Sequence, residues 1–195
     1  DLNQTVRSQS RRGDAPWKKI NGVNLDFTGR VKYIEKNYRN SKQIGEYLNR
    51  MLCYMNKFME QYNMISLKEF SYDSFETGDY EGILPVIRTG INRMDIQKQV
   101  IAAIKEIVEK YRVGYSDIAV LFPFKKNPAL KYYFMPWITE ALDKEGIPYS
   151  LITPPVDASQ SKVQYSKTTG VVLSTIDSSL GLDFKAVIVA GLFPY

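Results

Sequence analysis

The sequence predicts an α/β domain with a mainly parallel sheet. Apolar runs of strand length alternate with longer amphipathic stretches of helix length along the 195-residue chain, an order typical of such domains. Two short apolar runs, Val171–Leu173 and Ala186–Ala190, flank a polar segment that contains Gly181, as buried parallel strands flank an active-site loop. A hydrophobic content of 44% is enough for a sizeable core.

The N-terminal part predicts a basic loop region followed by a strand and a helix. Residues 1–30 are polar and basic, which indicates loops and short turns. Val31–Glu35 alternates as a strand does, and Ser41 is a suitable N-cap for a helix that runs to about Tyr62. Met and aromatic side chains recur on one face of this helix, where we expect them to fill a core, and Cys53 is expected to be a buried thiol.

The rest of the chain predicts alternating elements after a weakly patterned region. Between residues 63 and 94, Leu67–Tyr72 and Leu84–Arg88 resemble short strands. An amphipathic helix is expected over Asp95–Tyr111, with Asp95 as its N-cap and Gly114 after its end. The remaining expectations are a strand over Asp117–Phe122, a helix over Tyr133–Glu145 that Gly146 ends, a strand over Tyr149–Ile152 and a polar loop over 153–169.

Composition excludes several kinds of site. The chain has no histidine and one cysteine, which excludes a Ser-His-Asp triad, a histidine-ligated metal and a cysteine-clustered zinc, and we expect no metal site here. No signal peptide and no apolar run near the ~20 residues of a membrane span is present, so we expect a cytoplasmic protein without a membrane partner. The net charge of +5 favours a polyanionic partner only mildly.

Three loops that follow predicted strands carry residues suited to nucleotides. Ligands of parallel sheets gather after the carboxyl ends of the strands. Asn37–Asn40 pairs an aromatic ring with a guanidinium, Phe122–Lys126 pairs aromatics with two ammonium groups, and Thr175–Asp183 offers hydroxyls and two carboxylates. Rings can stack on bases and cations can pair with phosphates, so a nucleotide or single-stranded nucleic acid fits these loops. The alternative is that they are ordinary capped helix starts and surface turns.

Two phosphate-binding motifs are missing. The sequence contains neither G-x-x-x-x-G-K-S/T nor G-x-G-x-x-G. The chain is therefore not expected to hold a triphosphate and Mg²⁺ by itself in the manner of a P-loop.

Four segments, in order along the chain, resemble motifs of the UvrD/Rep-like superfamily 1 helicases. Asp1–Gln4 resembles the end of motif III, Asn37–Ser41 motif IV, Asp117–Leu121 with Gly146–Tyr149 the next segment of the same lobe, and Thr175–Phe184 motif V. The resemblance implies the second RecA-like lobe of an ATP-driven DNA helicase, a three-layer α/β domain without its own P-loop. Residues 1–30 would be the end of motif III and a linker, and 31–195 the single α/β core.

The resemblance also implies that the chain is a fragment of a longer protein. A first RecA-like lobe upstream would carry the P-loop and most of the Mg²⁺ site, and motif VI would lie beyond Tyr195. The expected partners are that N-terminal lobe and single-stranded or double-stranded DNA. The expected nucleotide is ATP with Mg²⁺, and the fragment alone is expected to be inactive.

Residue roles follow from positions in these motifs. Gln4 matches the residue that senses the γ-phosphate, Tyr38 the ring that stacks on adenine, and Arg39 the arginine finger. Asp183 matches the acid that binds the ribose, and Gly181 belongs to the same ATP-side segment. The residues expected to contact DNA are Phe122, Lys125, Thr175, Asp177 and Ser178.

Two departures from the family pattern keep other functions open. The motif V histidine is Asp177 and its lysine is Leu180, changes that should weaken contact with phosphate. A second hypothesis is therefore a helicase-like lobe that acts as a non-catalytic nucleic-acid-binding or regulatory module. A third is a doubly wound nucleotide-binding domain unrelated to helicases, in which the motif matches are accidental.

Overall fold

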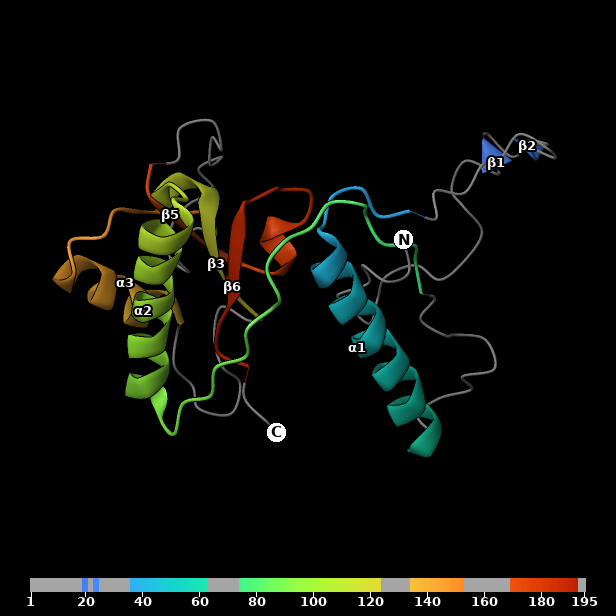
Figure 1. Cartoon of the computed structure of the whole chain (residues 1–195), viewed down its shortest axis with the longest axis horizontal. Helices are drawn as coiled ribbons and strands as arrows, with labels where there is room; N and C mark the ends of the chain where they lie inside the picture. Colours follow the sequence, from blue (N-terminus) through green and yellow to red (C-terminus); the bar gives the residue numbers. More distant parts are fainter. Residues whose placement is uncertain are drawn as a thin grey trace. The chain divides into compact units, whose positions relative to one another are not determined.

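The structure, a computed structural model, describes residues 19–20, 23–24, 36–62, 74–123, 134–152 and 169–192 (Figure 1). The chain divides into two compact units, Asp1–Ile87 and Arg88–Tyr195. In the first unit, β1 (Lys19–Ile20) and β2 (Val23–Asn24) form an antiparallel pair. The strand predicted at 31–35 lies outside the described residues, and the prediction of one lobe over residues 1–195 stays a prediction.

Helix α1 (Lys42–Gln61) dominates the described part of the first unit. It begins as predicted, because the Ser41 side chain accepts a hydrogen bond from the Ile44 backbone N–H at 3.5 Å. Gly45 is the one buried residue among its 20 residues and packs against Thr77. On the same side, the Asn49 side chain exchanges hydrogen bonds with the Phe75 backbone at 2.8 and 3.1 Å. The helix is therefore held by its small and polar side.

The apolar side of α1 is not a core, and that prediction was wrong. Ile44, Met51, Met55 and Phe58 are 37–46% exposed. Cys53, predicted to be a buried thiol, is exposed as well. The sequence pattern identified the helix and its apolar face, but among the described residues none of the apolar side chains on this face is buried.

The second unit is an α/β domain with a parallel sheet, as predicted. Its four described strands are β3 (Ile118–Phe122), β4 (Tyr149–Leu151), β5 (Val171–Thr175) and β6 (Ala186–Val189). They lie in the order β4-β5-β3-β6, and all three pairings are parallel. The arrangement, with helices against the sheet, is consistent with a RecA-like domain.

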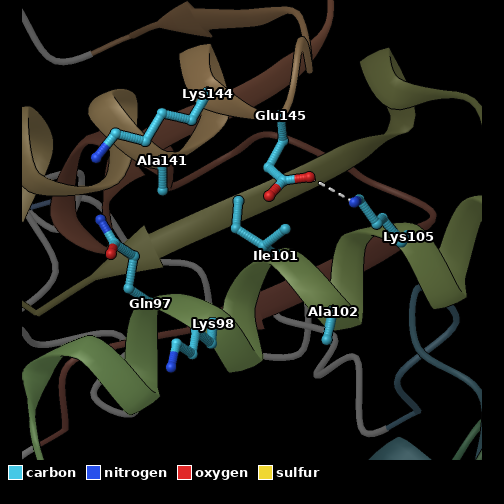
Figure 2. A pocket seen from close by; sticks show the side chains of 8 residues that line it. All are labelled: Gln97, Lys98, Ile101, Ala102, Lys105, Ala141, Lys144 and Glu145. Carbon is cyan, nitrogen blue, oxygen red and sulfur yellow. Dashed lines mark hydrogen bonds and ion pairs between the residues drawn. The ribbon is translucent and has the colours of Figure 1, made fainter.

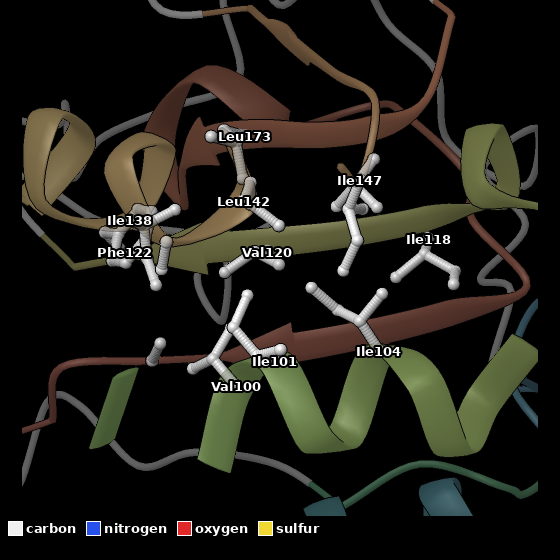
Figure 3. Close-up of a cluster of buried hydrophobic side chains, with 13 residues drawn as sticks. Val100, Ile101, Ile104, Ile118, Val120, Phe122, Ile138, Leu142, Ile147 and Leu173 are labelled. Atoms are coloured by element: carbon white, nitrogen blue, oxygen red, sulfur yellow. The ribbon is translucent and has the colours of Figure 1, made fainter. Parts of the chain in front are cut away.

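The main core lies between one face of the sheet and two helices, α2 (Arg93–Tyr111) and α3 (Phe134–Lys144) (Figure 3). Alternate residues of β3 point to this face, as the period of two in a strand requires. Because these side chains are almost fully buried, they carry much of the stability of the unit. The buried members are Val100, Ile101, Ile104, Ile118, Val120, Phe122, Ile138, Ala141, Leu142, Ile147, Val171, Leu173 and Ala190.

The opposite face of the sheet carries a smaller apolar cluster. Ala119, Val172 and Ile152 are buried there, packed against Leu182 and Phe184 from the connection between β5 and β6. On the edge strand β6, the outward side chains Val187 and Val189 are 49% and 46% exposed. The two faces therefore differ, since the described helices α2 and α3 both pack against the first.

One boundary and one predicted strand differ from the prediction. Helix α2 starts at Arg93 because the side chain of Asn92, not of Asp95, is the N-cap and accepts from the Asp95 backbone N–H at 3.0 Å. Leu84–Arg88 lies within the described residues and is not a strand. Its apolar side chains are exposed, because a β-like pattern forms a strand only where another strand pairs with it.

One glycine sets the entry into β5. Gly170 has φ +84°, and a Cβ at this position would lie 2.2 Å from the Pro148 carbonyl oxygen. The next residue, Val171, donates its backbone N–H to that same oxygen at 2.8 Å. Only glycine allows this close approach, which brings β5 into register beside β4.

Within the described residues, no helix is both long enough and apolar enough to cross a membrane.

Candidate functional site

The carboxyl ends of β3 and β5 are the first candidate location. The chain leaves β3 toward α3, which packs on the main core face. It leaves β5 through the 3-10 turn η6 (Asp177–Ser179) toward Leu182 and Phe184, which pack on the opposite face. Neighbouring parallel strands whose connections depart to opposite faces form a switch point, and ligands of open α/β sheets bind at such points.

A hydroxyl pair lies at this switch point. The Thr175 hydroxyl donates to Ser178 Oγ at 3.0 Å, and Thr175 Oγ1 accepts the Ser178 backbone N–H at 3.2 Å. The Ile176 backbone N–H donates to the Phe122 carbonyl at 2.9 Å and so ties the end of β5 to the end of β3. Thr175 is buried, while Ser178 and Asp177 are partly exposed. The predicted DNA-contacting residues Thr175, Asp177 and Ser178 are thus brought together at one edge of the sheet.

Phe122 does not face this edge. Its side chain is fully buried in the main core, beside residues of α3. The expectation that its ring contacts DNA does not agree with this burial: along β3 it occupies the same alternating face as Ile118 and Val120, which the helices cover. Lys125, predicted to act with it, lies outside the described residues.

The loop after η6 is open to solvent. Leu180 is half-exposed, and Gly181 and Asp183 are exposed. Gly181 has φ +90°, with no atom within 4 Å of the position a Cβ would take. Glycine is favoured here by backbone conformation and not by crowding, which leaves space beside the loop for a ligand.

In the first unit, Tyr38 and Arg39 lie in a tight turn directly before α1. The Asn37 side-chain oxygen accepts the backbone N–H groups of Arg39 and Asn40 at 3.0 and 3.1 Å, as in an Asx turn. Tyr38 is 72% exposed, and Arg39 is exposed as well. A ring and a guanidinium are thus presented to solvent by a turn whose backbone is fixed.

A second segment, 76–82, forms hydrogen bonds with both ends of this turn, and this contact was not predicted from the sequence. The Asn37 backbone N–H donates to the Glu76 carbonyl at 2.8 Å, and the Lys42 backbone N–H donates to the Tyr80 carbonyl at 3.0 Å. The Tyr80 hydroxyl donates to the Arg39 carbonyl. A Cβ on Gly78 would lie 2.7 Å from the Asn40 carbonyl oxygen, so this close contact requires glycine. In the sequence, Thr77–Asp79 indicates only a turn.

Lys36 is a further residue that the sequence did not single out. Its Nζ lies 2.6 Å from Asp79 Oδ2, 3.7 Å from Glu76 Oε1 and 5.6 Å from the centroid of the Tyr38 ring. The hydrogen bond to Asp79 raises the pKa of Lys36 above its usual value, so the ammonium stays charged over the ring. The signal in the sequence was a basic residue two positions before a tyrosine, which is too common to be informative.

A shallow pocket of about 290 Å³ lies between α2 and α3 (Figure 2). Its floor includes Ile101 and Ala141, and Lys105 on its rim pairs with Glu145 at 2.6 Å. Lys144 on the rim pairs with Glu140 at 2.9 Å. The residues that line the pocket include three lysines and one carboxylate, and two of the lysines are held in ion pairs. It contains none of the residues predicted to be functional.

The predicted site residues therefore fall into three groups. Tyr38 and Arg39 belong to the first unit, and Phe122, Thr175, Asp177, Ser178, Gly181 and Asp183 belong to the second. Gln4 and Lys125 lie outside the described residues. In the described part of the chain, no group of three or more Cys, Asp or Glu side chains could hold a metal ion.

Comparison of the chain with models of protein families, with curated proteins and with solved structures finds no match.

Proposed function

We propose that this chain is the second motor lobe of an ATP-dependent DNA helicase or translocase. In this role it supplies an adenine-stacking ring, an arginine finger and a ribose contact to an ATP site shared with another RecA-like lobe. It also contacts the backbone of single-stranded DNA.

The observation that carries the proposal is the pairing of β3 with β5. β3 covers most of Asp117–Leu121, and β5 leads directly into Thr175–Phe184; both segments resemble helicase motifs. The polar residues that follow β5 lie at the switch point of the sheet, where ligands of α/β proteins bind. The Ser178 hydroxyl there, which accepts from Thr175 and is partly exposed, is suited to donate a hydrogen bond to a phosphate oxygen.

The turn at Tyr38 and Arg39 supports the ATP side of the proposal. An exposed ring can stack on a base, and the adjacent guanidinium can form paired hydrogen bonds to phosphate oxygens. The backbone bonds from Asn37 and from segment 76–82 hold both residues in position before a nucleotide arrives. Such preorganisation is what an arginine finger needs, because its charge must already be in place when negative charge develops. Mg²⁺ would be held mainly by the other lobe.

The proposal is tested by Arg39→Ala in the intact protein. We expect DNA-stimulated ATP hydrolysis to fall about a thousandfold while ATP binding changes little, because an arginine finger acts chiefly in the transition state. The matched control is Arg50→Ala, which removes an exposed guanidinium from α1 in the same unit. Turnover that survives Arg39→Ala at the level of the control would contradict the role of Arg39.

A second candidate function is favoured by the loop after β5. Leu180 is half-exposed, and Asp177 carries a negative charge at the start of η6. In the helicase family that the chain resembles, side chains that can be cationic occupy both positions, whereas neither position is cationic here. This favours a lobe that binds nucleic acid weakly or regulates a partner without hydrolysing ATP. An intact protein that binds single-stranded DNA but hydrolyses no ATP would support this second function.

A further inference from the structure

The exposed ring of Tyr38 has a cation over it. The Lys36 ammonium lies 5.6 Å from the ring centroid, within the distance at which a cation and the face of a ring attract each other. Only 19% of the Lys36 side chain is exposed, although the carboxylates that hold it are 65% and 85% exposed. Lysine side chains at a surface normally extend into water, so this one is constrained.

The constraint comes from both backbone and side chain. Lys36 forms an isolated parallel bridge with Glu76, and the next residue, Asn37, donates its backbone N–H to the Glu76 carbonyl. The ammonium then reaches Asp79 Oδ2 at 2.6 Å. Lys36 is therefore anchored along its length to segment 76–82, the same segment that holds the turn before α1.

We propose that Lys36 is the positioning residue for nucleotide binding at Tyr38. Anchored by Asp79 and Glu76, its ammonium occupies one face of the ring and makes Tyr38 a platform on which a purine base stacks from the opposite face. This inference rests on the proposed function, in which a nucleotide binds at this turn.

The chemistry favours a purine. A cation draws the π electrons of the ring toward itself, so the opposite face becomes less negative and repels an electron-rich base less. A purine has two fused rings and overlaps the phenol more fully than a pyrimidine does. Lys36 should therefore influence which base binds as well as how tightly a nucleotide binds.

The test is Lys36→Met in the intact protein, which keeps an unbranched side chain one atom shorter and removes its charge. We expect the KM for ATP to rise about threefold to fivefold with kcat unchanged, and the KM for a pyrimidine triphosphate to change by less than about twofold. Lys36→Arg keeps a cation over the ring and should retain the KM of the parent protein. The matched control is Lys42→Met, because Lys42 lies in the same unit and pairs with Glu81 at 3.9 Å.

Three results would overturn the inference. One is a KM for ATP that is the same in Lys36→Met and Lys42→Met. Another is an equal rise for purine and pyrimidine nucleotides, which is what general damage to the turn would cause. The third is a failure of Lys36→Arg to retain the parent KM. If Lys36→Met does not fold, Asp79→Asn serves in its place, with an expected rise of about twofold that is again confined to purines.

A separate variant distinguishes failure of the inference from failure of the proposed function. Tyr38→Ala should raise the KM for ATP about tenfold, since stacking on an aromatic side chain is worth that much per base. If Tyr38→Ala has this effect and Lys36→Met does not, the role of Lys36 is wrong and the nucleotide site stands. If Tyr38→Ala has no effect, the nucleotide site and the inference are both wrong.

Discussion

Helices α1 and α2 have nearly equal lengths and are both amphipathic, α1 the more strongly, yet they are packed in opposite ways. Helix α2 buries Val100, Ile101 and Ile104 against the parallel sheet. Helix α1 buries Gly45 alone among its residues and leaves its methionine and aromatic side chains partly in solvent. An amphipathic pattern thus predicts that a helix forms and which side is apolar, but it does not identify what covers that side.

The same contrast separates the two candidate sites. At the switch point of the sheet, the polar residues end or directly follow a strand whose position is set by a buried core. At Tyr38, the turn is held by hydrogen bonds and one anchored lysine. Positioning by burial resists changes of solvent and salt, whereas positioning by exposed polar contacts is sensitive to both.

The largest effect is expected from a pair of substitutions, one in each helix, that tests the difference in burial between α2 and α1. Ile104→Ala should lower the free energy of unfolding by about 3–5 kcal/mol, because a fully buried side chain leaves a cavity against the sheet. Ile44→Ala should cost about 1 kcal/mol or less, since that side chain is already more than a third exposed. Urea unfolding followed by circular dichroism measures both, and equal losses would contradict the difference in packing between the two helices.

A smaller effect is expected from a substitution on the one packed side of α1. Alanine is normally favoured over glycine within a helix by about 1 kcal/mol. A Cβ at Gly45, however, would lie 2.8 Å from Thr77 Cγ2, so we expect Gly45→Ala to lower the free energy of unfolding by about 1–2 kcal/mol. In a Thr77→Ser background, which lacks that methyl group, the same change should become neutral or stabilising. A loss that persists in this background would mean that Thr77 is not the obstacle.

The smallest effect concerns a surface ion pair of the second unit. Arg88 hydrogen-bonds to Glu106 and lowers the pKa of that carboxyl below 4.5. Such a group contributes stability above pH 4.5, and the contribution is lost as pH falls through the lower pKa of the folded state. The free energy of unfolding, measured at a series of acid pH values, should therefore decline less steeply in Arg88→Met than in the parent protein. Equally steep declines in the two proteins would exclude this contribution of the Arg88–Glu106 pair to stability.

Much of the second unit, and helix α1 of the first, could be predicted from local sequence signals. The apolar runs of β3 and β5 and the starts of α1 and α2 depend on a few neighbouring residues, so these boundaries were predicted to within about two positions, although the cap of α2 is Asn92 and not Asp95. Leu84–Arg88 could not be predicted in this way, because a strand depends on a partner elsewhere in the chain.

The candidate site was predicted only in part, for the same physical reason. The exposed Tyr38 and the cluster at Thr175 follow from their places after predicted strands. The anchoring of Lys36 by Asp79 joins residues from two separate segments of chain, and no local pattern contains it. The burial of Phe122 depends on which face of β3 the helices cover, which alternation alone does not specify.

The strand order β4-β5-β3-β6 also has a consequence for how the second unit folds. The four described strands are all parallel, so none of them is joined to another by a tight hairpin. β3 can pair with β5 and β6 only after these later segments of the chain have returned beside it. Closing such long stretches costs conformational entropy before any ladder bond forms. We therefore expect a high contact order and folding on the scale of milliseconds to seconds, with α2 and α3 structured early and the β3–β5 pairing as the slow step.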